Sequence, residues 1–217
     1  MLVCRYQRGL VMLCSKIIEN INSTINDPSN VSFSLARKID VLNEGIKAVV
    51  LIRPESSSVY YEHQVQDDTK QTLPSDCFRL LRVIRNINGT TKGKSIRKMD
   101  LDRVSDRVVD WHYADSASEA LEYAYDNAIQ NVFWIYPKLS SPIGKKIELV
   151  YQKNVQEVSS TSDAFPINDA YSVAVQEWML YLLWGGEDEQ SATYNKALKR
   201  YESFFNLLGI KKQADDS

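Results

Sequence analysis

The segment Val41–Pro54 constrains the fold of this chain more than any other stretch of its sequence. Its apolar residues recur at spacings of three and four, as Leu42, Ile46 and Val49 do, which predicts a helix with one buried face. The helix cannot pass Pro54, because proline lacks an N–H donor and disfavours helical geometry in the residue before it. The polar residues that follow predict a change of architecture after this point.

A second apolar stripe precedes this segment. Leu10, Cys14, Ile17 and Ile21 are spaced by four, three and four residues, which predicts another amphipathic helix. The helix that ends at Pro54 is expected to begin near Ser34. We expect the two helices to form an antiparallel hairpin in which each buries its stripe on the other.

Helical patterns return after a long interval. Asn168 is expected to cap a helix over residues 169–184, whose apolar residues cover more than one face and predict enclosure on several sides. A last helix is expected to start at the acidic residues 187–189, where negative charge favours a helix N-terminus. Gly209 is expected to end it, with Ile210 next to it in a Schellman motif.

The middle of the sequence has the composition and turn residues of β-strands. A turn is expected over residues 67–70, and Asp100 is expected to cap a short helix. Strands are predicted over residues 57–66, 78–87, 94–98, 121–125, 132–136 and 147–151.

These elements predict an α+β fold. Helices from both ends of the sequence form an antiparallel bundle that carries an inserted β-rich domain. The expected helical bundle comprises residues 1–55 and 167–210, the insertion comprises residues 56–166, and residues 211–217 are expected to be a mobile tail.

The composition argues against several classes of protein. The formal net charge of the 217 residues is −2, without the basic excess of a dedicated nucleic-acid binder. No stretch approaches the ~20 apolar residues of a membrane helix, and the run at residues 10–14 is too short for a secretory signal. Cys4, Cys14 and Cys77 lack the spacing of a disulfide framework or zinc site, which favours a reducing compartment.

Candidate catalytic and metal-binding residues are sparse. His63 and His112 are the only histidines, and neither belongs to a paired motif such as HExxH. Asp100, Asp102 and Asp106 lack the glycine and glutamate of an EF-hand loop, so a helix start is the expected structure there. We therefore expect no catalytic residue, no cofactor and no metal site.

The region from Arg79 to Lys98 is locally basic. Its Gly93-Lys-Ser95 resembles the end of a P-loop, but Asn88 stands where the Walker spacing requires a glycine. A solvated sheet surface is the expected role of this region, and contact with DNA phosphates is the weaker alternative.

The candidates for contact with DNA phosphates or with a DNA channel are Arg85, Lys92 and Lys94. Side chains alternate between the two faces of a regular strand, so Arg82 and Arg85 cannot share a face. We therefore expect the positive charge to be spread over both faces.

The order and spacing of several motifs resemble those of the head–tail adaptor (connector) proteins of tailed bacteriophages. The resemblance is strongest to the tail tubular protein A-like adaptors of short-tailed phages, and it covers residues 8–209. The first helix departs most, with a longer loop over residues 22–30. The similar motifs are Leu42-Asn43-Glu44, Val49–Pro54, Gln71–Pro74, Leu80–Asn86, Trp111-His112, Phe133–Pro137 and Ile147–Tyr151, followed by the last two helices.

The resemblance implies a structural virion protein that is not an enzyme. Such a protein would form a dodecameric ring beneath the portal, receive the tail nozzle protein and tail fibres, and take part in genome ejection. DNA would pass through the ring without sequence recognition and without membrane contact. Assembly would occur in the host bacterial cytoplasm, and the product would lie in the neck of the virion. The residues implied in portal binding are Phe204, Phe205, Gly209, Ile210, Lys211 and Lys212.

Two other functions remain open at the level of sequence. A small hydrolase would use carboxylates of the β-rich domain, and it would require convergent Asp or Glu side chains with perturbed pKa values. A nucleic-acid-binding module would use the basic Arg79–Lys98 hairpin, and its DNA affinity would fall steeply with salt.

Overall fold

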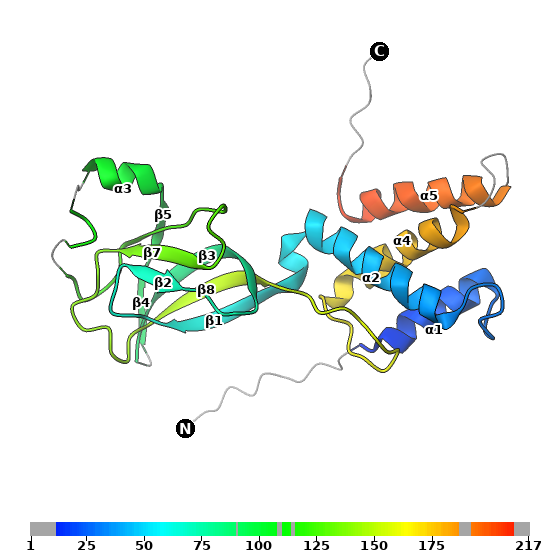
Figure 1. Ribbon diagram of the computed structural model, residues 1–217, viewed down its shortest axis with the longest axis horizontal. Helices are drawn as coiled ribbons and strands as arrows, with labels where there is room; N and C mark the ends of the chain where they lie inside the picture. The colour runs from blue at the N-terminus through cyan, green and yellow to red at the C-terminus, as the bar shows by residue number, and fades with distance from the viewer. Residues whose placement is uncertain (1–11, 90, 108–109, 114–115, 187–191, 211–217) are drawn as a thin grey trace, which may run out of the picture. The chain divides into compact units, whose positions relative to one another are not determined.

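The chain has an α+β fold that divides into two compact units (Figure 1). The computed structural model describes residues 12–89, 91–107, 110–113, 116–186 and 192–210. Residues 1–57 and 155–217 form the helical unit, and residues 58–154 form the β unit. Leu10 of the first predicted stripe, the acidic start at 187–189 and the tail 211–217 lie outside the described residues.

The β unit contains two four-stranded sheets and one short helix, α3. One sheet has the order β1-β8-β3-β4 with antiparallel pairs, and the other has the order β2-β7-β6-β5 with a parallel β5–β6 pair. The elements are β1 (Ser58–Gln64), β2 (Lys70–Thr72), β3 (Cys77–Asn88), β4 (Thr91–Ser95), β5 (Arg97–Met99), α3 (Leu101–Arg107), β6 (Glu122–Ala124), β7 (Val132–Tyr136) and β8 (Lys146–Lys153).

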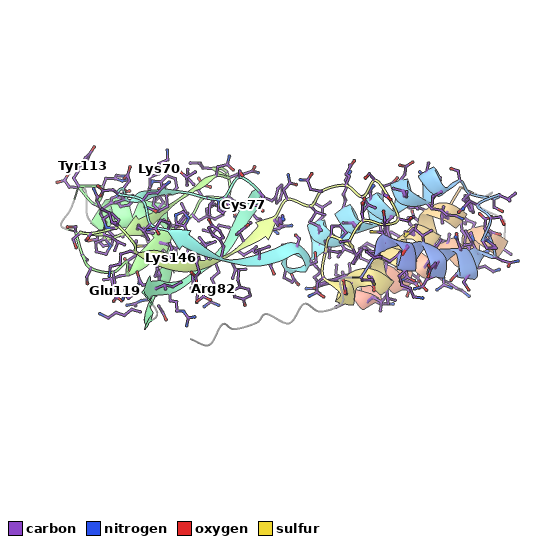
Figure 2. The ribbon with its side chains drawn as sticks, turned by 90° about the horizontal axis from the view of Figure 1, so that it is seen from below. Lys70, Cys77, Arg82, Tyr113, Glu119 and Lys146 are labelled. Carbon is purple, nitrogen blue, oxygen red and sulfur yellow. The ribbon has the colours of Figure 1, made fainter. Side chains whose placement is uncertain are left out.

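The two sheets share one hydrophobic core. Val83 of β3 and Leu149 of β8 are buried in it together with Phe133 and Ile135 of β7. Each sheet therefore has an inward face and an opposite, outward face. In Figure 2, Lys70 of one sheet and Arg82 of the other lie on opposite sides of the β unit.

Two details of the β unit differ from the prediction. The strand β2 begins at Lys70, the last residue of the predicted turn, and pairs with β7. The predicted strand over residues 94–98 is divided between β4 and β5, which belong to different sheets. Ile96 lies between these strands, and its N–H donates to the carbonyl oxygen of Ile84. The chain therefore passes from one sheet to the other at Ile96, within the segment that the sequence predicts to be one continuous strand.

In the helical unit, two helices begin next to residues whose side chains cap them. The Ser34 hydroxyl accepts a hydrogen bond from the Arg37 N–H at 3.2 Å, and the Asn168 side chain accepts one from Ala170 at 2.9 Å. The helices are α1 (Cys14–Ile25), α2 (Leu35–Ile52), η1 (Pro54–Ser57), η2 (Asp169–Tyr171), α4 (Ser172–Trp184) and α5 (Ala192–Leu207). No described helix is long and apolar enough to cross a membrane.

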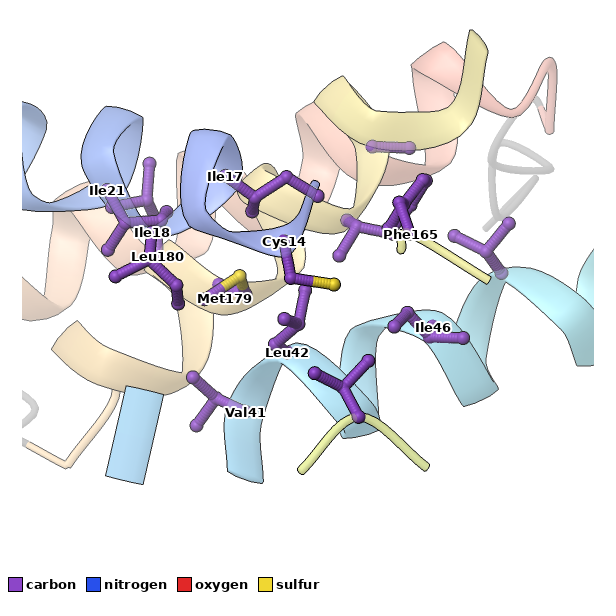
Figure 3. Packing of buried hydrophobic residues seen from close by; sticks show 14 of the residues in the cluster. Cys14, Ile17, Ile18, Ile21, Val41, Leu42, Ile46, Phe165, Met179 and Leu180 are labelled. Carbon is purple, nitrogen blue, oxygen red and sulfur yellow. The ribbon is translucent and has the colours of Figure 1, made fainter. Parts of the chain in front are cut away.

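The core of the helical unit is built around α4. Cys14 and Ile17 of α1, Leu42 of α2 and Met179 of α4 point toward one another (Figure 3). The α4 helix contacts α1, α2 and α5, which confirms the predicted enclosure on several sides. The prediction that α1 and α2 bury their apolar stripes on each other is wrong, because both helices pack mainly against α4.

A glycine permits the close approach of α2 to α4. A Cβ atom at Gly45 would lie 3.1 Å from Val175 Cγ1 and 3.2 Å from the Val175 carbonyl oxygen. These distances are shorter than ordinary van der Waals contacts, so a larger side chain would separate the helices.

Candidate functional site

Aromatic side chains hold the end of α5 against α4. Phe204 is fully buried, and its ring centre lies 4.6 Å from that of Trp178. The Tyr201 ring lies 5.0 Å from Tyr181 and 4.8 Å from Phe205. Phe204 is therefore a core residue that supports this end of the helix, whereas Phe205 is only partly buried.

The end of α5 is a Schellman motif, as predicted from the sequence. The Ile210 N–H donates to the Phe205 carbonyl oxygen, and the Gly209 N–H donates to the Asn206 carbonyl oxygen, both at 3.0 Å. Gly209 has a φ of +69°, a left-handed conformation that side chains with a Cβ rarely adopt. The predicted role of Gly209 as the residue that ends α5 is confirmed.

Arg53 completes this helix end from a distant part of the sequence. Its Nε donates a hydrogen bond of 2.9 Å to the Leu208 carbonyl oxygen, and its Nη2 donates to the same oxygen. Because the carbonyl end of a helix carries partial negative charge, the guanidinium is favourable there. The geometry of residues 205–210 is thus fixed both locally and from α2.

Two apolar side chains remain exposed at this fixed end. Leu207 is 52% exposed and Ile210 is 36% exposed. We refer to Phe205, Leu207, Gly209 and Ile210 as the α5-end surface. Lys211 and Lys212, which the resemblance also implies in portal binding, lie outside the described part of the chain.

Three arginines of β3 share one face of their sheet, contrary to the prediction that the charge is spread over two faces. Arg79, Arg82 and Arg85 lie opposite residues 152, 150 and 148 of β8, which are alternate residues of that strand. Register shifts occur just before each arginine, so two residues of β3 oppose one residue of β8 at these points. β3 is therefore not the regular strand that the prediction assumed.

We refer to Arg79, Arg82 and Arg85 as the arginine row. Arg79 Nε donates to Gln152 Oε1 at 2.7 Å, and Arg85 Nε lies 2.6 Å from Glu148 Oε2. Arg82 is exposed between them. Two of the three guanidinium groups are thus held in position by β8.

The hairpin β3–β4 forms one edge of the sheet β1-β8-β3-β4. A Cβ atom at Gly93 would lie 2.7 Å from both Cβ and the carbonyl oxygen of Asn86, so the glycine permits the two strands to approach closely. Lys94 is exposed, with its Nζ 3.8 Å from Glu119 Oε2. The side chain of Lys92 lies outside what the structure describes. Arg85 and Lys94 therefore each face a carboxylate of this chain.

The histidines lie in separate structural environments. His63 is buried, with Nε2 3.3 Å from Gln71 Oε1; desolvation lowers its pKa, and the Gln71 hydrogen bond offsets part of this effect. His112 Nδ1 lies 3.0 Å from Thr69 Oγ1. Within the described ranges, no group of three or more His, Cys, Asp or Glu residues is placed to hold a metal ion.

Cys14, Cys77 and Asp100 have environments that suit a role in the fold rather than in catalysis. Burial, with a smaller contribution from a nearby aspartate in each case, raises the pKa of Cys14 and of Cys77 to about 11. Both thiols are therefore protonated at neutral pH and are poor nucleophiles. Asp100 Oδ1 accepts the Asp102 N–H at 3.0 Å, which is the expected helix start. Cys4 lies outside the described residues.

A comparison with protein families agrees with the resemblance seen in the motifs. The model of the family described as SU10 adaptor protein matches residues 12–217. The match spans the residues of both units that the structure describes. No curated protein matches the chain.

Proposed function

The chain belongs to the SU10 adaptor protein family, whose members are structural adaptors of bacteriophage virions, and on this premise we propose that it joins the portal to the tail nozzle. In this proposal, copies of the chain form a dodecameric ring in the neck of a short-tailed phage. DNA passes through the ring during genome ejection, and tail fibres attach around it. Assembly takes place in the cytoplasm of the host bacterium.

The helical unit is the proposed scaffold of the ring. The helices α1, α2, α4 and α5 contribute to one core, which supports their action as one antiparallel bundle. The β unit is then an insertion between α2 and α4 with a core of its own. A closed ring of identical chains needs two different complementary surfaces on each copy, and two separate units offer more than one surface for this purpose.

The α5-end surface is the proposed portal contact, and its geometry is the observation that carries this assignment. Leu207 and Ile210 are exposed apolar residues on a helix end that Arg53 and the Schellman motif hold in place. A preformed surface loses little conformational entropy on binding. The contact continues into Lys211 and Lys212, while Phe204 supports it from inside the core.

Electron microscopy of the purified protein, with and without the portal protein of the same phage, tests the adaptor function. Closed rings seated on the portal are the expected result. If the protein neither binds portal nor forms rings, the adaptor function is wrong for this chain.

Truncation tests the portal contact separately. A variant that lacks residues 211–217 retains the Schellman motif, and one that lacks residues 209–217 loses it as well. We expect both variants to remain folded, with weaker co-sedimentation with portal in the first and none in the second. Undiminished co-sedimentation of both would contradict the docking site and leave the adaptor function intact.

A further inference from the structure

The outward face of the sheet β1-β8-β3-β4 has the residue content of a surface that meets nucleic acid. We propose that the arginine row and Tyr60 contact the phosphate backbone of duplex DNA without reading its sequence. The inference rests on the proposed function, because the adaptor ring supplies the DNA. The sequence alone places the candidate DNA contact on the β3–β4 hairpin, whereas the proposed contact lies on the face of the sheet.

The bulges of β3 are the first step of the argument. In a regular strand, positions 79 and 85 would share a face and position 82 would point to the other face, toward the core. The register shifts place all three arginines opposite alternate residues of β8. Two residues of β8 span roughly 6.8 Å, so the arginines form a row of regularly spaced positive charges. Bulges commonly re-aim side chains in this way.

The charge balance of the face is the second step. Among the side chains that the structure describes, the cations of this face are the three arginines and Lys146, and its carboxylates are Glu62 and Glu148, which leaves an excess of two positive charges. Lys146 Nζ lies 2.9 Å from Glu62 Oε2, and Arg85 is paired with Glu148. Arg79 is held by an uncharged glutamine, and Arg82 has no ion pair within the described residues. The excess is therefore centred on Arg79 and Arg82.

The neighbours of Arg82 favour DNA over a protein partner. Arg82 lies opposite Val150 of β8, which lies opposite Tyr60 of β1. Tyr60 is 71% exposed, and a tyrosine hydroxyl is a common donor to phosphate. The remaining residues of the face are mainly charged or amide side chains, whereas the core of a protein–protein interface is depleted of charge. Protein–DNA interfaces are polar and positively charged, as this face is.

The expected affinity for DNA follows from the number of charged side chains on this face and from their pairing. Only three arginines are available, two of them already hold a partner on β8, and the whole chain has a net charge of −2. The affinity of one copy for DNA is therefore low and depends strongly on salt. Such a contact guides DNA through a ring without holding it.

A titration of labelled duplex DNA with the full chain tests the inference, with fluorescence anisotropy read between about 50 and 200 mM NaCl. Three phosphate contacts predict that the logarithm of the binding constant falls with the logarithm of salt with a slope of about −3. Arg82→Gln is expected to weaken binding several-fold at low salt and to reduce the slope by about one. Arg79→Gln combined with Arg82→Gln is expected to reduce it by about two.

Lys70→Gln is the matched control. Lys70 is an exposed cation of the other sheet, on the opposite side of the β unit from Arg82 (Figure 2). Its removal changes the net charge by the same amount and is expected to leave DNA binding unchanged. Equal losses in Lys70→Gln and Arg82→Gln would overturn the inference, because binding would then depend only on net charge.

Two further outcomes separate this inference from the adaptor function. Protein that forms rings on portal but does not bind duplex DNA at low salt overturns the inference and leaves the adaptor function standing. Protein that binds DNA through the arginine row but never joins portal supports the inference and contradicts the adaptor function. If Arg82→Gln prevents ring formation and leaves DNA binding unchanged, the face contacts protein and the inference is wrong.

Discussion

The guanidinium of Arg53 donates hydrogen bonds to the carbonyl oxygen of Leu208, and so joins the ends of two helices. Arg53 is also the C-cap of α2, where its own N–H donates to the Val49 carbonyl oxygen at 2.7 Å. Pro54 ends α2 at this residue, and the φ of Arg53 is −124°, outside helical geometry. The proline that stops one helix therefore makes an arginine available to cap another.

Replacement of Arg53 by Met is expected to lower the free energy of unfolding by about 1 kcal/mol. The value is modest because the arginine side chain is 37% exposed, and solvent screens its charge. Urea denaturation followed by circular dichroism measures the change. Arg53→Lys keeps the positive charge but has only one nitrogen that can donate. Its free energy of unfolding is expected to lie between those of wild type and Arg53→Met. An unchanged urea midpoint in Arg53→Met would show that the cap does not stabilise the fold.

Replacement of Gly209 by Ala is expected to destabilise the chain by about 1 kcal/mol. The left-handed φ of +69° is unfavourable for alanine, and a Cβ there would lie 3.1 Å from Arg53 Nη2. Gly186→Ala is the control, since a Cβ at that glycine meets no atom within 4 Å. Thermal unfolding of the two variants should differ by several degrees; equal midpoints would contradict the proposed strain at Gly209.

A buried lysine organises the loop between α1 and α2. The Lys38 ammonium is fully buried and lies 2.6 Å from Asn22 Oδ1, 2.9 Å from Asn30 Oδ1 and 3.0 Å from Asp27 Oδ2. The Asp27 carboxylate also accepts hydrogen bonds from the backbone N–H groups of residues 31–33. Desolvation raises the pKa of Asp27, but these hydrogen bonds outweigh it and hold the pKa well below its usual range.

The lowered pKa of Asp27 predicts acid sensitivity. A carboxyl group whose pKa is lower in the folded state stabilises the fold above its unfolded pKa, which is about 4, and this contribution is lost as the pH falls toward the folded pKa. Asp27→Asn is therefore expected to be less stable than wild type at pH 7, with the difference shrinking below pH 4. Melting temperatures measured across this pH range test the prediction. Asp40→Asn, at an exposed position of α2, is the control.

The features predicted correctly from the sequence are those set by nearby residues. The helix start near Ser34, the cap at Asn168 and the Schellman motif at Gly209 each depend on hydrogen bonds that span a few positions. The residue types at those positions carry the information, so a single sequence is sufficient. The same holds for the stop of α2 before Pro54.

The features that were missed depend on partners far along the chain. The three arginines of the arginine row share one face because the pairing of β3 with β8 contains register shifts. These shifts depend on the partner strand and were not predicted from the residues of β3. The burial of Lys38 also depends on acceptors outside α2, which come from α1 and from the loop that follows it. Helical periodicity likewise identifies the buried stripes of α1 and α2 but does not show that α4 is their larger partner.

Replacement of Leu207 by Ser is expected to weaken portal binding while leaving the helical unit folded. Loss of one buried apolar side chain from an interface costs roughly 1.5–3 kcal/mol, which corresponds to a dissociation constant about ten-fold or more higher. Leu207 is already half-exposed in the free chain, so its loss should scarcely change the melting temperature. Leu198→Ser is the matched control, because Leu198 is a 41% exposed leucine of the same helix outside the α5-end surface. Portal binding measured by surface plasmon resonance should fall for Leu207→Ser alone; equal affinities of the two variants would place the portal contact elsewhere on the chain.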